Sequence, residues 1–184
     1  MFERGFKAWC ERLALEKRKE LKLRPHDPLG AMSLAQNLGI AICTVENVPN
    51  LSDKAKRVLL KEDPDGWSAV TICFNGRKLI ILNSAHSVGR QASDLMHELA
   101  HHLLGHKQSP VQISQEGLMM LHSYDQQQEA EADWLAGCLL LPREALVSIK
   151  RAQVDAAEAA KHYGVSMALL NYRLGVSGVN YQFS

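Results

Sequence analysis

Apolar residues recur every three or four positions along much of the chain, the spacing that places them on one face of an α-helix. In the first such stretch Phe6, Trp9 and Leu13 are separated by charged residues. Two short helices are also expected, one after Ser52 and one opening at Pro142. The longer predicted helices span residues 3–22, 27–39, 90–104, 126–140, 154–162 and 166–174.

Capping residues suggest where several of these helices begin and end. Asp27-Pro28 offers an acidic cap followed by proline in the first turn, which favours a helix start. Gly39 and Gly105 follow the last apolar positions of two helices and are expected to end them. Gly164 and Ser166 break and recap the final helical pair.

Short apolar or β-branched runs predict a few strands. Residues 40–45 form one such run, and residues 67–74 and 77–82 flank Asn75-Gly76, a strong β-hairpin signal. Residues 110–124 show neither periodicity clearly and are expected to form a loop with a short helix.

Length and composition narrow the possibilities. A chain of 184 residues fits one ordinary domain, and 46% hydrophobic residues can form one good core. Because 21 basic residues face 20 acidic ones, charge gives no argument for direct binding to nucleic acid or membranes. We find no apolar run of transmembrane length, and the charged N-terminus does not resemble a signal peptide. The sequence leaves the oligomeric state undefined.

The cysteines support an intracellular location. Cys10, Cys43, Cys73 and Cys138 are scattered, lie in apolar runs and form no Cys-x-x-Cys pair. We therefore expect buried free thiols and a reducing, cytoplasmic environment.

The strongest chemical signal is His97-Glu98-Leu99-Ala100-His101. Residues four apart lie on one helix face, so His97 and His101 can direct two imidazoles at one cation. Glu98 can reach a metal-bound water without being a ligand. This is the arrangement of a zinc peptidase helix, in which the carboxylate takes the proton of the water and later delivers it to the leaving amine.

Two histidines leave a tetrahedral site short of a protein ligand. His106 directly follows Gly105 and does not fit the spacing of a third histidine ligand, so we consider it a weak candidate. The acidic helix around Glu129 is a better source. Glu129 could bind the metal while Asp133, on the same face, accepts a hydrogen bond from a ligand histidine. Glu131 points about 160° away from Glu129 around the helix axis and is a weaker candidate.

Less specific interpretations apply to the same residues. The histidine motif can arise by chance in a buried helix, and an acidic helix face is often simply solvated. Residues 157–174 superficially resemble a DNA-binding helix-turn-helix. Its second helix, however, offers Asn171, Tyr172 and Arg173 with little other basic charge, so we favour a packing role.

Most of the chain resembles the ImmA/IrrE family of metallo-endopeptidases. The histidine motif alone is shared by many zinc peptidases, and the ordered set of segments is far more specific. The segments that carry the resemblance are the opening amphipathic helix and residues 34–40, 80–83, 90, 97–106, 129–136, 139–142, 163–166 and 172–174.

This resemblance implies an α+β, mainly helical, zincin-like fold with a small three-stranded antiparallel or mixed sheet. It implies one Zn²⁺ per chain held by His97, His101 and Glu129, with Glu98 as the catalytic carboxylate. We expect a single metallopeptidase domain over residues 1–184. Its parts would be N-terminal helices and a first strand in 1–45, a catalytic core in 46–142 and C-terminal helices in 143–184.

The resemblance also suggests the substrate. Members of this family typically act on helix-turn-helix transcriptional repressors, often encoded beside them in phages, mobile elements or stress regulons. We therefore expect an endopeptidase that relieves repression. Two alternatives remain: a metal-stabilised antirepressor that sequesters its target without cutting it, and a DNA-binding regulator that uses residues 157–174.

Overall fold

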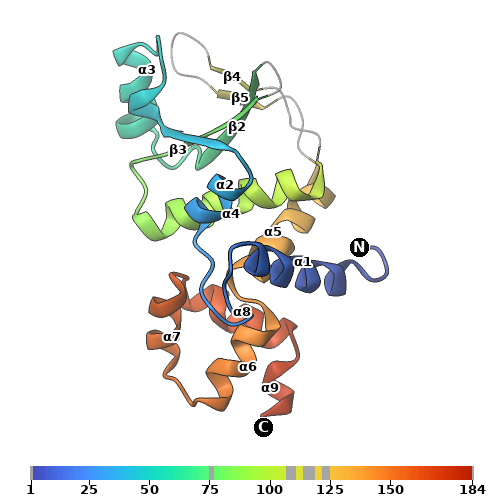
Figure 1. Ribbon diagram of the computed structural model, residues 1–184. Helices are drawn as coiled ribbons and strands as arrows, with labels where there is room; N and C mark the ends of the chain where they lie inside the picture. Colours follow the sequence, from blue (N-terminus) through green and yellow to red (C-terminus); the bar gives the residue numbers. More distant parts are fainter. Residues whose placement is uncertain (1, 75–76, 107–110, 114–118, 122–124, 184) are drawn as a thin grey trace.

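A computed structural model describes residues 2–74, 77–106, 111–113, 119–121 and 125–183 (Figure 1). A small sheet and helix α4 lie at one end of the molecule, helices α6 to α9 lie at the other, and α1 and α5 lie between them. The helices are α1 Phe6–Glu20, α2 Ala31–Asn37, η1 Val45–Asn47, α3 Asp53–Arg57, η2 Val58–Glu62, α4 Val88–Leu104, α5 Gln126–Leu140, α6 Arg143–Arg151, α7 Ala156–Tyr163, α8 Met167–Val176 and α9 Val179–Gln182. The strands are β1 Ala41–Thr44, β2 Ala69–Phe74, β3 Arg77–Leu82, β4 Val111–Ile113 and β5 Met119–Leu121.

The main sheet has three strands in the order β1-β3-β2. Strand β1 runs parallel to β3, and β2 pairs with β3 in the antiparallel direction. The predicted α+β fold with a small mixed sheet is therefore confirmed. Strands β2 and β3 flank the predicted hairpin turn at residues 75–76, which lies outside the described residues.

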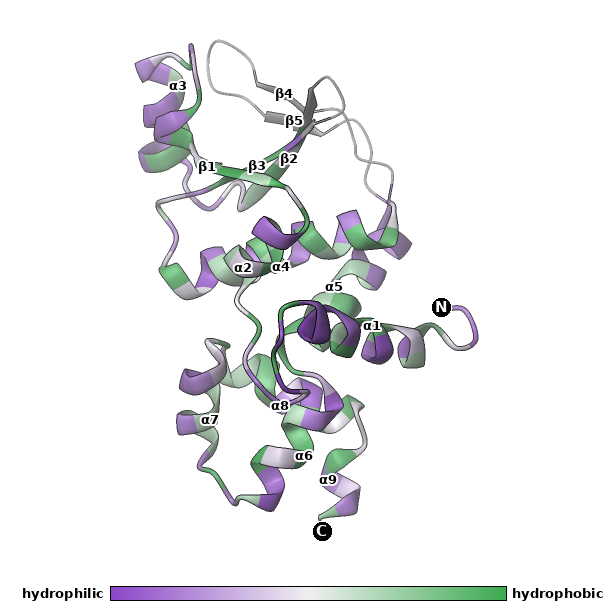
Figure 2. Cartoon of the chain, in the orientation of Figure 1, coloured by the Kyte–Doolittle hydropathy of each residue, from purple (hydrophilic) through white to green (hydrophobic). Residues whose placement is uncertain are grey.

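The two faces of this sheet pack against different partners because successive side chains of a strand point to opposite sides. Val70 on β2 and Ile81 on β3 pack with Leu59 beside α3. Ile80 and Leu82 belong instead to the larger core that contains α4 and α5. Figure 2 shows hydrophobic residues concentrated in these strands and hydrophilic ones along much of α1.

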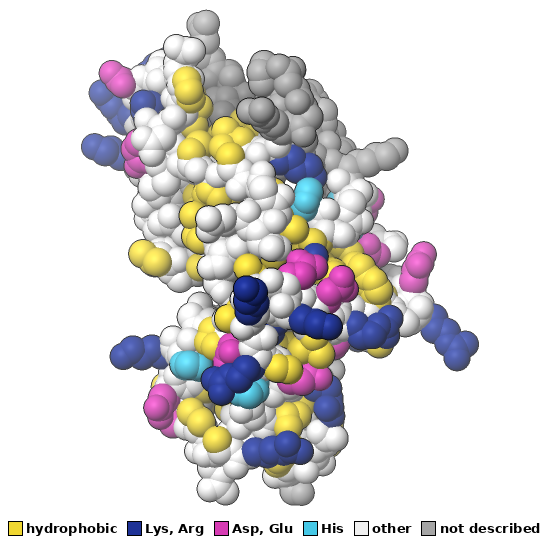
Figure 3. Space-filling model, viewed as in Figure 1, with side chains coloured by type: hydrophobic (Ala, Val, Ile, Leu, Met, Phe, Trp, Pro, Cys, Tyr) yellow, Lys and Arg dark blue, Asp and Glu magenta, His cyan; other side chains and the backbone are white. Residues whose placement is uncertain are grey.

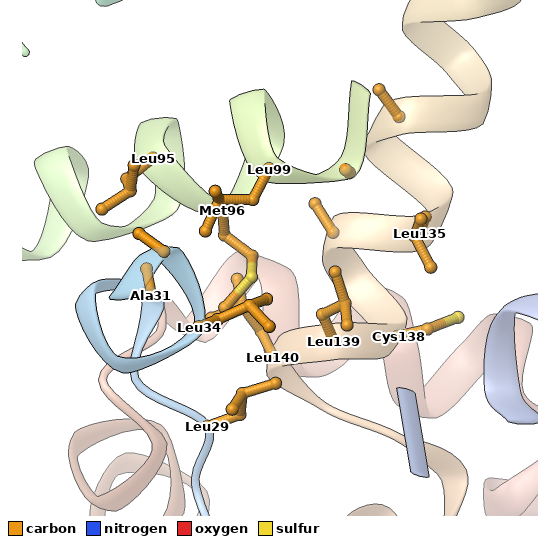
Figure 4. Packing of buried hydrophobic residues seen from close by; sticks show 14 of the residues in the cluster. Leu29, Ala31, Leu34, Leu95, Met96, Leu99, Leu135, Cys138, Leu139 and Leu140 are labelled. Atoms are coloured by element: carbon orange, nitrogen blue, oxygen red, sulfur yellow. The ribbon is translucent and has the colours of Figure 1, made fainter. Parts of the chain in front are cut away.

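Helix α4 buries one face against α2 and α5. Leu95, Leu99 and Leu103 recur every four residues along α4; the first two are fully buried, and Leu103 packs at the edge of the same cluster. Figure 4 shows Leu95 and Leu99 on the side of α4 that faces α2 and the C-terminal half of α5. Because this face is fixed by packing, the remaining face of α4 is available for polar chemistry.

Two buried arginines hold the C-terminal end of α5. Nη2 of Arg18 donates to the carbonyl of Leu139 at 2.7 Å, and Nε of Arg173 donates to the carbonyl of Leu141 at 3.1 Å. Burial lowers the pKa of Arg18 to about 10. Gly137 leaves room for Arg173, since a Cβ there would lie 3.1 Å from its Cδ. These bonds satisfy carbonyl groups that no longer have partners within the helix.

The prediction of a helix start at Asp27-Pro28 was wrong. Helix α2 begins at Ala31, with Gly30 at its N-cap. The Asp27 carboxylate instead accepts hydrogen bonds from the backbone N–H and the side chain of Arg24, at 2.8 and 3.0 Å. An Asp side chain can accept hydrogen bonds from several nearby groups. Here the carboxylate that could have capped the helix pairs with Arg24 instead.

Residues 110–124 also differ from expectation. The parts that the structure describes form an antiparallel pair, β4 and β5, and β4 lies against β2. Pairing of this kind is a tertiary contact, so a sequence window does not reveal it. By contrast, the final pair of predicted helices is present as α7 and α8, separated at Gly164, which has φ of 65°.

The surface carries mixed charge. Figure 3 shows Lys and Arg side chains alternating with Asp and Glu over α1. Cys10 and Cys138 are free and buried, as predicted, while Cys43 is free and half-buried. The side chain of Cys73 lies outside the described part of the chain. Within that part, no helix has both the length and the apolar character needed to cross a membrane.

Candidate metal centre

Helix α4 positions the two histidines of the motif. Ser87 caps its start by accepting a hydrogen bond from the backbone N–H of Arg90 at 3.3 Å, and Gly105 ends it in the left-handed conformation. Between these caps the helix is regular, so His97 and His101 lie one turn apart on one side. Their Nε2 atoms are 3.0 Å from each other.

Helix α5 brings a carboxylate to the same point. The Asp125 side chain caps α5 by accepting from the backbone N–H groups of Gln127 and Gln128, at 2.9 and 3.2 Å. Glu129 lies in the first turn that follows. Its carboxylate oxygens lie 3.2 Å from Nε2 of His97 and 3.5 Å from Nε2 of His101.

The spacing of these three donors fits a metal ion. Ligand atoms about 2.0–2.1 Å from a tetrahedral zinc ion lie about 3.3 Å from one another. The two histidine nitrogens are 3.0 Å apart, and the two oxygens of the Glu129 carboxylate lie 3.2 Å from one nitrogen and 3.5 Å from the other, close to that value. Among the described residues, His97, His101 and Glu129 form the one group of three or more such side chains compact enough to hold a metal.

Asp133 supports one of the histidines. Its Oδ1 lies 2.9 Å from Nδ1 of His97, the ring nitrogen that faces away from His101 and Glu129. Burial by itself would lower the pKa of His97, but the hydrogen bond and charge of Asp133, together with Glu129, raise it overall. Burial and the charge of His97 lower the pKa of His101. The two imidazoles therefore resist carrying a proton each at the same time.

Glu98 lies beside this group and is oriented by the sheet. The hydroxyl of Thr71, on β2, donates a hydrogen bond to Oε2 of Glu98. Burial raises the pKa of Glu98, and the Thr71 hydrogen bond partly offsets this effect. Sequence reasoning missed Thr71. The one available signal was a hydroxyl residue in an otherwise apolar strand, next to Val70 on the opposite face.

The weaker candidates lie outside the three-donor group. Nδ1 of His106 lies 2.9 Å from Nδ1 of His101, on the side of that ring away from Glu129. Oε2 of Glu131 lies 3.3 Å from Nε2 of His106. Both side chains therefore contact the site only through His101.

One side chain on which the helix-turn-helix interpretation depends is not available to contact DNA. Arg173 on α8 is only 1% exposed, and its Nη2 donates to Glu11 at 2.6 Å. A guanidinium held in this way cannot reach a phosphate. Tyr172 on the same helix remains exposed, and its ring contacts Trp134 of α5.

A small mixed sheet beside a helix with two histidines, and a second helix with a carboxylate, is the arrangement of a metallopeptidase domain. Comparison with known families agrees. The chain belongs to the IrrE N-terminal-like domain family of peptidases (Peptidase M78), whose model matches residues 35–175. This finding confirms the family expected from the sequence and implies that the protein uses a metal ion.

Solved structures show the same fold. A Mycobacterium tuberculosis transcriptional regulator aligns with 94% of this chain at 16% sequence identity and a TM-score of 0.50. The present chain spans 47% of the length of that protein. Among curated proteins, a sequence search finds no significant match.

Proposed function

We propose that the chain is a zinc-dependent endopeptidase. One Zn²⁺ would be held by His97, His101 and Glu129. The observation that carries this proposal is the convergence of these three donors, from α4 and α5, at separations of 3.0 to 3.5 Å. A His/His/carboxylate set is a known catalytic zinc set that leaves a position free for water and substrate, and membership of a peptidase family supports the same function.

Glu98 is the residue placed to move protons. A bound zinc ion would polarise the scissile carbonyl and lower the pKa of the attacking water. The Glu98 carboxylate would accept the proton of that water and return it to the leaving amine. Its orientation is set by Thr71, whose hydroxyl holds Oε2 and leaves the other oxygen for this role. The partial burial of Glu98 raises its pKa toward the range useful for a general acid.

Asp133 would assist by fixing His97. A carboxylate 2.9 Å from Nδ1 favours the tautomer with the proton on Nδ1, so Nε2 keeps its lone pair for the metal.

For the substrate, we propose a helix-turn-helix transcriptional repressor encoded near the gene for this chain, in a phage, a mobile element or a stress regulon. Cutting the repressor in the cytoplasm would relieve repression. The resemblance to the ImmA/IrrE family supports this choice, and the solved structure with a similar fold is described as a transcriptional regulator.

The test combines cleavage with metal content. Purified zinc-loaded protein is incubated with the repressor encoded nearby, and the products are identified by mass spectrometry. We expect one defined cut by the wild type and none by Glu98→Gln, with equal zinc content in the two proteins. If Glu98→Gln relieves repression in cells as well as the wild type does, the chain is a metal-stabilised antirepressor that sequesters its target. An uncut repressor in the wild-type reaction, with zinc bound, would point the same way.

A further inference from the structure

His101 uses both ring nitrogens in the site. Its Nε2 faces His97 and Glu129, and its Nδ1 lies 2.9 Å from Nδ1 of His106. Beyond it, Nε2 of His106 lies 3.3 Å from Glu131, and the other oxygen of Glu131 accepts a hydrogen bond from Gln127 at 3.0 Å. The side chains of His106 and Glu131 are only 8% and 17% exposed. Hydrogen bonds shielded to this degree are stronger than the same bonds in water.

The geometry of this chain of bonds selects one arrangement of hydrogens. With the hydrogen of His101 on Nδ1, that N–H donates to Nδ1 of His106, and the N–H at Nε2 of His106 donates to the Glu131 carboxylate. In the reverse arrangement, the bare Nε2 of His106 would face a carboxylate, lone pair against lone pair. The reverse arrangement would also place a hydrogen on Nε2 of His101, so that nitrogen would have no lone pair to offer a metal ion. The chain therefore favours the His101 tautomer whose Nε2 lone pair is free.

From this we infer that His106 and Glu131 are positioning residues, which hold His101 in the tautomer and orientation that bind the metal ion. This inference rests on the proposed zinc site. It gives a role to two side chains that are poor ligands themselves. Nδ1 of His106 is occupied by His101 and its Nε2 by Glu131, so neither nitrogen is directed at the three-donor group.

The two histidine ligands are then supported unequally. His97 is held by Asp133, whose side chain is 75% exposed, whereas His101 is held through a largely buried pair. Water competes for an exposed hydrogen bond and screens it, and it does so much less for a buried one. Loss of the His106 side chain should therefore weaken metal binding more than loss of the Asp133 side chain does.

The experiment measures zinc affinity directly, by competition with a chromophoric chelator, so no substrate is needed. The variants are His106→Phe, which keeps the ring volume and removes both nitrogens, Glu131→Ala and the double variant. His102→Phe is the matched control, because His102 neighbours His101 on α4 but pairs with Lys78 at 2.7 Å. Asp133→Ala tests the inequality, and His106→Gln tests whether a different acceptor for the His101 N–H restores binding.

We expect His106→Phe to bind one zinc ion about 10–100-fold more weakly than the wild type, with no change in His102→Phe. The double variant should be no weaker than His106→Phe alone, since Glu131 acts through His106. Asp133→Ala should lose less zinc affinity than His106→Phe does. His106→Gln should bind zinc almost as tightly as the wild type. Circular dichroism of the metal-free proteins checks that each variant folds.

Three results from the variants would overturn the inference. Wild-type affinity in His106→Phe would remove the role of His106, and additive losses in the double variant would separate it from Glu131. If His106→Phe loses its zinc as completely as His101→Ala does, His106 is itself a metal ligand. A wild-type protein that binds no zinc would overturn the proposed function as well, which distinguishes the two failures.

Discussion

The hydroxyl of Thr71, in the middle of strand β2, donates a hydrogen bond to the carboxylate of Glu98 on helix α4. The two residues are 27 positions apart in the sequence. Their contact exists because the alternation along β2 places Val70 on one face of the sheet and Thr71 on the other, toward α4. The sheet therefore does more than cover the motif helix, since it fixes the orientation of the proposed catalytic carboxylate.

Replacing Thr71 tests this orientation. Thr71→Val keeps the shape of the side chain and removes the donor, so Glu98 loses a hydrogen bond to a charged group, an interaction that contributes about 1.5–3 kcal/mol. We expect kcat for repressor cleavage to fall about tenfold or more, with zinc content unchanged. Thr71→Ser keeps the hydroxyl and should retain most of the activity. Loss of zinc in Thr71→Val would show that the effect is structural.

The choice between the acidic residues of α5 is tested by metal content. Elemental mass spectrometry of untagged protein should give about one zinc per chain for the wild type and for Glu98→Gln. Glu129→Ala should lose most of the metal, because it removes one of the three donors in the group. Glu131→Ala should keep more of it. If the order of these two variants reverses, the metal ligand on α5 is Glu131.

Removing the metal should lower thermal stability. A ligand that binds only the folded state stabilises it by about 2.7 kcal/mol at 100 times its Kd, which corresponds to a shift of about 5–10 °C in Tm for a chain of this length. We therefore expect a chelator to lower the Tm of the zinc-loaded wild type by that amount. His97→Ala/His101→Ala is the control, and its Tm should not respond. An equal response in the two proteins would place the bound metal elsewhere.

We expect Arg173 to stabilise the folded protein and not to contact nucleic acid. Arg173→Met removes the guanidinium that donates to the Glu11 carboxylate and to the Leu141 carbonyl. Glu11 keeps the N–H of Arg143 at 2.9 Å, so the cost should lie at the lower end of the roughly 3–5 kcal/mol for breaking a buried pair. Urea unfolding should show a loss of about 3 kcal/mol or more. Adding Glu11→Gln should recover part of it. Arg151→Met, at an exposed position of α6, should change stability by less than about 0.5 kcal/mol.

Several features of the fold could be predicted because they depend on neighbouring residues. The helix predicted over 126–140 has the bounds of α5, and the hairpin signal at residues 75–76 lies between β2 and β3. Helical spacing alone places His97 and His101 on one side of α4. The start of α2 was predicted wrongly. Asp27 can either cap a helix or pair with Arg24, and its position in the sequence does not show which of the two it does.

The sequence by itself determined the motif, the amphipathic faces and the family, since each rests on residue types at fixed short spacings. The sequence also favoured Glu129 over Glu131, and only the tertiary structure showed that the Glu129 carboxylate lies 3.2 and 3.5 Å from the two histidines. It also revealed that Thr71 contacts Glu98 and that His106, itself paired with Glu131, contacts His101. These contacts depend on how α4, α5 and the sheet pack against one another. That packing is set by the whole buried core, and no single segment of the chain encodes it.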